Sequence, residues 1–326
     1  QAYVKASNTG AGDRFGASVA LSGETLVVGA LDEASAAQGV NGNQTDDSKP
    51  SSGAAYVFVR KGARWSQQAY LKASNPDDSD QFGTSVAISG DTLVVGANRE
   101  SSAATTVDGD QADNSANDAG AAYVFVRKGA RWSQQAYLKA SNAETFDNFG
   151  LSVAVSGDTV AVGALVEASA ADGINGNQAD NSAINAGAVY VFTRSGSAWS
   201  QQAYVKASNS EGNDLFGISV ALSGDLLLVG ARNEASNATG INGNQADNSL
   251  FSSGAAYLFR RDDELWSQQA YLKASNTDSG DIFGSTLALS GTSAFIGARQ
   301  EQSNATGIGG NQADDSLSEP GAAYAF

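Results

Sequence analysis

The chain has 326 residues, with 35 acidic and 19 basic side chains and a formal net charge of −16 at pH 7. A chain with this much negative charge repels the phosphates of nucleic acids and of anionic lipids. We therefore expect no nucleic-acid partner and no membrane insertion. Cysteine and histidine are both absent. Their absence excludes disulfides, the usual zinc sites, and the Ser-His and Cys-His pairs of nucleophilic enzymes.

One stretch of sequence recurs five times. FGASVALSGETLVVGA starts at residue 15, and related copies start at 82, 149, 216 and 283, always 67 residues after the previous one. A fixed period of this kind indicates one repeat architecture rather than several unrelated domains. We therefore expect a single domain over residues 1–326, built from five 67-residue repeats.

The first repeat shows the expected elements in chain order. Residues 15–21 place Phe, Ala, Val and Leu on one side and Gly, Ser and Ala on the other, which predicts a strand covered on both faces. A two-residue turn near Gly23 leads to a second strand over 25–30. After a long polar loop from about 31 to 52, strands are expected over 53–60 and 65–73, joined by a turn at Lys61-Gly62.

Four antiparallel strands in each of five tandem units predict an all-β fold, a five-bladed β-propeller. In such a fold the bulky face of one blade packs on the small face of its neighbour. Residues 1–7 align with a fourth strand, and the chain ends after a third strand. We therefore expect this N-terminal strand to complete the last blade by pairing with residues 321–326. An open β-solenoid or a row of separate sheets is the alternative; period-two patterning excludes a helical solenoid.

The repeats resemble the FG-GAP repeat of integrin α-chain propellers and of bacterial secreted or surface proteins. The resemblance rests on Phe-Gly at 15, 82, 149, 216 and 283 and on Val-Gly-Ala or Ile-Gly-Ala at 28, 95, 162, 229 and 296. It implies a calcium-bearing extracellular propeller used in adhesion or ligand binding. Integrin propellers, however, have seven blades and carry their calcium loops between the first two strands. Here that hairpin is only SGET or SGDT, so the integrin metal site does not transfer to this sequence.

The long loops hold the candidate site. They contain VNGNQTDDS at 40, VDGDQADNS at 107, INGNQADNS at 174 and 241, and IGGNQADDS at 308. Loops usually vary fastest, so their constancy needs a cause. Oxygen atoms at alternate positions suit Ca²⁺, and several neutral amides among them would make the sites weak ones of the extracellular type. We predict one calcium ion in each blade.

The predicted ligands from the long loops are Asn41, Asn43, Asp46, Asp108, Asp110, Asp113, Asn175, Asn177, Asp180, Asn242, Asn244, Asp247, Asn311 and Asp314. Ten further acids, also fixed among the repeats and expected on the same side, are Glu33, Glu100, Glu167, Glu234, Glu301, Asp13, Asp80, Asp147, Asp214 and Asp281. The second repeat, with three aspartates, is expected to bind best, and the fifth, with Gly309 in the first ligand position, worst. The alternative is that these residues build Asx turns without any ion, and recent duplication would also keep the copies alike.

Charge and aromatic residues suggest possible partners. All but seven of the 35 acidic residues belong to the long-loop side, while basic residues cluster at the hairpins between third and fourth strands. An acidic loop face fits a protein or glycan ligand, or self-association; ordinary solvated charge is the alternative. A tryptophan opens each outer strand, at 65, 132, 199 and 266, and could serve as a sugar platform or as packing.

These patterns favour an extracellular or cell-surface binding or adhesion module that calcium stabilises. The alternatives are a structural subunit of an extracellular fibre or surface layer, and a lectin-like sugar binder. We do not expect an enzyme, because catalysis usually needs one asymmetric site and the repeats offer five nearly equal ones.

Overall fold

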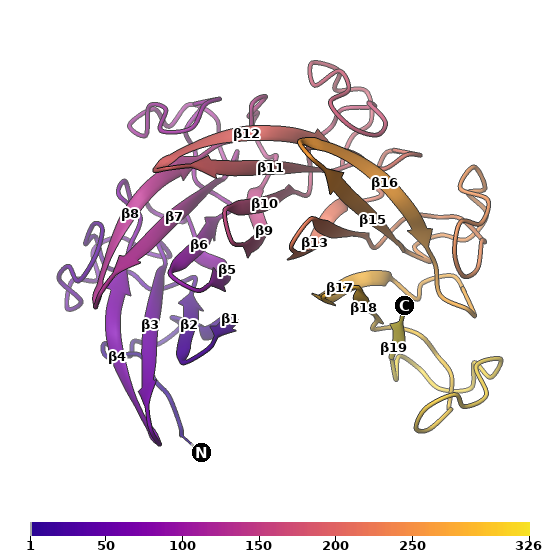
Figure 1. Ribbon diagram of the computed structural model, residues 1–326, viewed down its shortest axis with the longest axis horizontal. Coiled ribbons are helices and arrows are strands. Elements are labelled where there is room, and N and C mark those ends of the chain that lie inside the picture. The colour runs from indigo at the N-terminus through magenta and orange to yellow at the C-terminus, as the bar shows by residue number, and fades with distance from the viewer. Residues whose placement is uncertain (1) are drawn as a thin grey trace. The chain divides into compact units, whose positions relative to one another are not determined.

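A computed structural model describes residues 2–326, in which every regular element is a β-strand (Figure 1). The strands form five antiparallel sheets, each following the chain order of its strands. The predicted all-β five-bladed propeller is therefore confirmed. No helix capable of crossing a bilayer occurs in the described residues.

Each blade begins at one of the five Phe-Gly pairs. Blade 1 contains β1 Phe15–Ser22, β2 Thr25–Ala30, β3 Ala54–Lys61 and β4 Arg64–Leu71. Blade 2 contains β5 Phe82–Ser89, β6 Thr92–Ala97, β7 Ala121–Lys128 and β8 Arg131–Leu138. Blade 3 contains β9 Phe149–Ser156, β10 Thr159–Ala164, β11 Ala188–Ser195 and β12 Ala198–Val205.

The last two sheets differ in strand number. Blade 4 contains β13 Phe216–Ser223, β14 Leu226–Ala231, β15 Ala255–Asp262 and β16 Leu265–Leu272. Blade 5 has three strands, β17 Phe283–Ser290, β18 Ser293–Ala298 and β19 Ala322–Ala325. The chain divides into two compact units, residues 1–164 with 191–201, and residues 165–190 with 202–326.

The first strand of each blade is less regular than the sequence predicted. In blade 1, Phe15 pairs with Ala30 but the next pair is Ser18 with Gly29, so a bulge interrupts the expected alternation. Gly16 lies in this bulge with φ 97°. The irregularity turns the ring of Phe15 toward Tyr56, with ring centroids 5.4 Å apart. A strictly alternating pattern does not predict this bulge, because it assumes that every residue of one strand pairs with one residue of the next.

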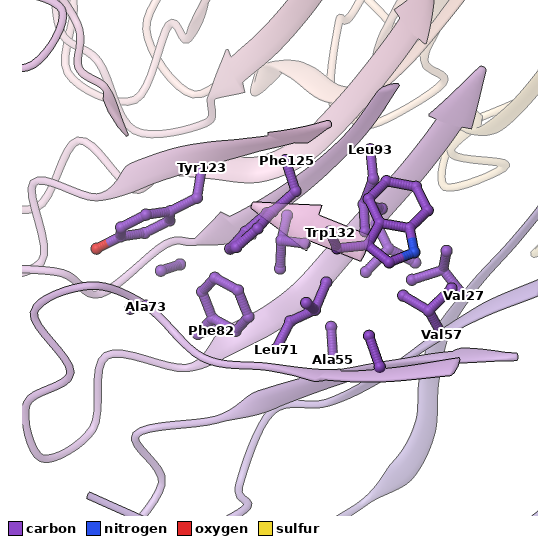
Figure 2. Close-up of a cluster of buried hydrophobic side chains, with 14 of the residues drawn as sticks. Val27, Ala55, Val57, Leu71, Ala73, Phe82, Leu93, Tyr123, Phe125 and Trp132 are labelled. Carbon is purple, nitrogen blue, oxygen red and sulfur yellow. The ribbon is translucent and has the colours of Figure 1, made fainter. Parts of the chain in front are cut away.

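Inside the first unit, blades 1 and 2 pack bulky side chains against smaller ones. Figure 2 shows Val57 and Leu71 of blade 1 in one buried cluster with Phe82 of blade 2. The opposite face of blade 1 buries Tyr56 and Tyr70 in a separate cluster. The face turned to blade 2 thus carries mainly alanine and valine, and the other face carries the large aromatic rings. The prediction that residues 15–21 are covered on both faces is wrong for blade 1, where Val19 is 65% and Leu21 63% exposed.

Backbone-to-backbone contact explains the glycine of the Val-Gly-Ala signature. A Cβ atom on Gly29 would lie 2.1 Å from the carbonyl oxygen of Gly83 in the next blade. In the second unit, a Cβ on Gly230 would lie 2.0 Å from the carbonyl oxygen of Gly284. Any side chain at these positions would force neighbouring blades apart, so glycine is required by close approach.

The N-terminal segment packs on blade 1. In the same way, the end of the fourth strand of blade 1 and the residues after it pack on blade 2. Val4 and Ala6 join the cluster of Tyr56 and Tyr70. They match Leu71 and Ala73 by repeat position, and those residues join the corresponding cluster of blade 2. Residues 2–7 belong to none of the nineteen strands, and residue 1 lies outside the described residues. Their pairing with residues 321–326 stays a prediction.

Candidate functional site

The long loop between the second and third strands is built alike in the repeats, and its first candidate ligand has a backbone role. Asn41, Asp108 and Asn175 adopt φ values of 58°, 54° and 55°, in the left-handed region. The side-chain oxygen of Asn41 accepts a hydrogen bond from the backbone N–H of Tyr70 at 2.9 Å. In the fifth repeat the position is Gly309, with φ 68°. Asparagine, aspartate and glycine are the residues that adopt this conformation most readily, so Gly309 preserves the loop shape.

The invariant glycine that follows is fixed by packing. A Cβ on Gly42 would lie 2.7 Å from the Cβ of Ala37, closer than non-bonded Cβ atoms approach one another in proteins. The same clash recurs, at 2.6 to 2.8 Å, for Gly109, Gly176, Gly243 and Gly310 against the equivalent alanines. The loop therefore closes on itself at this point, and only glycine fits.

The next two candidate ligands form Asx turns. The side-chain oxygen of Asn43 accepts a hydrogen bond from the backbone N–H of Thr45 at 3.1 Å, and Asp46 accepts one from Ser48 at 2.9 Å. Asp110, Asn177, Asn244 and Asn311 repeat the first turn. Asp113, Asp180, Asp247 and Asp314 repeat the second. Hydrogen bonds from Ser48 hold the pKa of Asp46 below its usual value. These are the turns of the ion-free alternative.

The invariant glutamine ties the loop to the segment that leads into the blade. The side-chain oxygen of Gln44 accepts a hydrogen bond from the Ser7 hydroxyl. The same contact joins Ser74 to Gln111, Ser208 to Gln245 and Ser275 to Gln312. These contacts give a structural cause for the constancy of the glutamine.

The glutamates sit under the loop in a buried network rather than at its surface. Glu33 is 1% exposed and pairs with Lys72, which is fully buried, at 2.9 Å. The same carboxylate accepts hydrogen bonds from Tyr70 at 2.7 Å, Asn8 at 2.8 Å and the backbone N–H of Ser35 at 3.1 Å. Equivalent buried ion pairs join Glu100 to Lys139, Glu167 to Lys206 and Glu234 to Lys273. Glu301 is also buried and accepts a hydrogen bond from Asn276.

The aspartates before each Phe-Gly close a turn. Asp80 accepts a hydrogen bond from the backbone N–H of Asp77 at 2.7 Å, and Asp13 accepts the matching bond from Gly10 at 2.7 Å. Asp147, Asp214 and Asp281 repeat it. Burial raises the pKa of Asp80 to about 8, of Asp214 to about 7 and of Asp281 to about 6. These carboxyl groups hold protons that exposed aspartates would have lost.

The predicted calcium ligands are therefore not gathered into one cage. The glutamates pair with buried lysines, the loop oxygens accept backbone hydrogen bonds, and the aspartates close a separate turn. Among residues 2–326 no three or more acidic side chains are placed to share a metal ion. The carboxylates alone therefore form no shared cluster in the described residues, and loop shape explains Gly309, so the predicted ranking of the repeats stays untested. We therefore favour the ion-free alternative; calcium binding itself stays untested.

A polar hollow opens beside the loops of blades 1 and 2. It has a volume of about 480 Å³ and is lined by Ser48, Lys49, Asp77, Asp78, Asn114 and Asn117, among others. Asp77 accepts hydrogen bonds from Lys49 and, at 2.8 Å, from Asn114. Asp78 is exposed. The hollow offers charged and amide groups of both donor and acceptor type to a ligand.

The tryptophans and hairpin arginines are engaged in packing. Trp132 is 5% exposed and donates a hydrogen bond to Gln68 at 2.8 Å. Arg127 stacks on the Trp132 ring at 5.1 Å and pairs with Asp91 at 2.7 Å. Trp199 and Trp266 repeat the arrangement. This arrangement agrees with the packing interpretation, and pairing with acids offsets the basic charge of the hairpins.

Sequence reasoning missed the buried lysine and its partners. A lysine is normally exposed to solvent, so residue type alone does not predict that Lys72 in AYLKASN is buried. The available signal was its recurrence at 5, 72, 139, 206 and 273, always after an aromatic and an aliphatic residue and always three residues before an asparagine.

Comparison with curated proteins finds no match for the chain. The family model described as the FG-GAP repeat matches residues 1–58, 65–125, 132–192, 199–259 and 266–326. These five matches cover nearly all of the sequence and share its period. The chain therefore belongs to the FG-GAP repeat family.

Proposed function

We propose that this protein is an extracellular or cell-surface adhesion module that binds a basic protein surface with its long-loop face. The FG-GAP propeller fold indicates a binding module. Adhesion, the location outside the cell and the identity of the ligand are parts of our proposal.

The observation that carries the proposal is the rigid construction of the loops. Each loop uses its recurring residues for internal contacts, namely an asparagine, aspartate or glycine in the left-handed conformation, a glycine packed on alanine, and two Asx turns. A loop held in this way loses little conformational freedom when a ligand binds, so more of the contact energy appears as affinity. The same shape recurs along the chain, which favours multivalent binding.

Charge supports a basic ligand. The long-loop side carries 28 of the 35 acidic residues; the five glutamates and four of the aspartates before Phe-Gly are buried, and exposed members such as Asp47 and Asp78 lie at its surface. An acidic surface raises the association rate of a basic partner through long-range attraction, and salt weakens that attraction.

Binding of the full chain to arrays of basic matrix proteins and neutral or acidic glycans tests the proposal. We expect binding to basic proteins that strengthens with ligand density and weakens as salt increases. Asp78→Asn removes one exposed negative charge from the loop face and should weaken binding. Asp263→Asn removes one exposed charge from a hairpin of blade 4, where residue 263 has φ 57°, and serves as the matched control.

Equal binding by both variants would contradict the assignment of the loop face. Binding to glycans alone would favour the lectin-like alternative. Absence of any ligand, together with filaments under the electron microscope, would favour a structural subunit instead.

A further inference from the structure

A buried lysine, a buried glutamate and a half-buried asparagine meet in the same way in at least three places in the described chain. In blade 1 one carboxylate, that of Glu33, lies between the amine of Lys72 and the side-chain amide of Asn8. Lys139, Glu100 and Asn75 form the second such triad, and Lys273, Glu234 and Asn209 the third. The proposed binding function uses none of these groups.

The contact distances are nearly constant. Lysine Nζ lies 2.9, 3.0 and 2.9 Å from one oxygen of its glutamate in the three triads. The asparagine amide nitrogen lies 2.8, 3.0 and 3.2 Å from the other oxygen. The lysines and glutamates are at most 1% exposed. Both nitrogen atoms therefore share one carboxylate that water does not reach.

A tyrosine completes each triad. The Tyr56 hydroxyl donates a hydrogen bond to the carbonyl oxygen of the Asn8 side chain at 2.6 Å. Tyr123 and Tyr257 make the same contact to Asn75 and Asn209, each at 2.7 Å. Burial raises the pKa of Tyr56 well above its usual value, so its hydroxyl keeps the proton. A fixed donor on a carbonyl oxygen stabilises the negative charge that develops there when a nucleophile attacks.

Burial also favours an uncharged lysine. Desolvation lowers the pKa of the Lys72, Lys139 and Lys273 ammonium groups, although their glutamates oppose the shift. A desolvated lysine is the form in which this side chain acts as a nucleophile. A buried ion pair becomes neutral when the ammonium proton moves to the carboxylate.

We propose that each of these lysines forms an isopeptide bond with the asparagine of its triad. In blade 1, Glu33 takes a proton from the Lys72 ammonium, and the free amine attacks Cγ of Asn8. The carbonyl electrons move to the oxygen held by Tyr56. Glu33 then gives its proton to the amide nitrogen, the Cγ–Nδ2 bond breaks, and ammonia leaves. The remaining extra proton on Nζ returns to Glu33, so atoms and charge balance and nothing is oxidised or reduced.

The sequence positions give these bonds a consequence for the fold. Lys72 reaches back to Glu33 within blade 1, whereas Asn75, three residues later, reaches Glu100 of blade 2. Each segment that leaves a fourth strand thus supplies the amine of its own blade and the amide of the next. The bond from Lys139 to Asn75 would tie blade 2 to the end of blade 1. A chain without cysteine would gain a covalent brace at each blade junction where such a bond forms.

Peptide mapping of the full-length folded protein by mass spectrometry tests the proposal. We expect branched peptides that join Lys72 to Asn8, Lys139 to Asn75 and Lys273 to Asn209, each lighter than its two parts by one ammonia. Whole-protein mass alone does not decide, because cyclisation of Gln1 and imide formation at Asn-Gly sequences such as 41–42 also release ammonia. Recovery of all three lysines only in linear peptides would overturn the proposal.

A substitution of the glutamate in one triad tests whether its carboxylate is needed to form the isopeptide bond. Glu100→Gln should abolish the Lys139–Asn75 bond and leave the other two intact, so that the same molecule contains its own controls. Glu264→Gln, at an exposed hairpin position, should leave all three bonds in place. A Lys139–Asn75 bond that persists in Glu100→Gln would contradict the mechanism. If that variant does not fold, the wild-type peptide map still decides whether the bonds exist.

Discussion

The invariant loop glycine offers a test of the loop's construction through the substitution Gly243→Ala. The added methyl carbon would start 2.6 Å from the Cβ of Ala238, whereas carbon atoms in contact lie about 3.5–4.0 Å apart. Gly243 has no left-handed φ, so the backbone itself accepts alanine. The cost is therefore overpacking, and we expect the free energy of unfolding to fall by about 1–3 kcal/mol.

The clash can be removed from its other side. Ala238→Gly deletes the methyl group that Gly243→Ala would strike, at a cost of about 0.5–1 kcal/mol from the added backbone freedom. If the two carbons clash, the double variant is more stable than the sum of the single effects predicts, by about 1 kcal/mol or more. Urea unfolding of the four proteins measures this coupling. Strictly additive effects would refute the packing explanation for the invariant glycine.

Three other changes have definite expected outcomes. Burial raises the pKa of Asp80 from its usual 3.8 to about 8, so its contribution to stability is lost as the pH rises through that window. Asp80→Asn should therefore raise the melting temperature at pH 8 more than at pH 4; an equal change at both would contradict the assignment. Trp132→Phe removes the hydrogen bond to Gln68 and should cost about 1–3 kcal/mol in urea unfolding, so an unchanged midpoint would argue against this packing role. Gly96→Ala places a Cβ 1.9 Å from the backbone oxygen of Gly150 in the next blade. It should destabilise the protein more than Gly243→Ala does, and a smaller effect would mean that the blades separate easily.

The fold was largely predictable because the repeats reveal their own strand boundaries. The second strand of blade 1 was expected over 25–30 and lies at Thr25–Ala30. The third and fourth strands are each shifted by a residue or two. What the pattern could not show is the bulge after Phe15, because two extra residues in one strand leave the order of bulky and small side chains unchanged.

The sequence predicted which loop residues recur among the repeats, but not whether they bind an ion or form turns. Asparagine, aspartate and glycine serve equally as oxygen ligands and as turn residues, so the sequence left both interpretations open. Backbone geometry gives the turn role a cause, since Asn41 and Gly309 share a left-handed conformation that an oxygen ligand does not require, but it does not test calcium binding. The burial of Lys72 was not predictable from residue type. A lysine is rarely buried unless it has an ionic partner, and here that partner, Glu33, is distant in the sequence.

Thermal unfolding of the full-length protein with a chelator and with excess calcium tests most directly the claim that the loops hold their shape through their own hydrogen bonds. A ligand that binds only the folded state raises its melting temperature by mass action. Because the loop oxygens already accept backbone hydrogen bonds, we predict the same melting temperature in both conditions. A rise with calcium that saturates and is lost on adding the chelator would contradict this account.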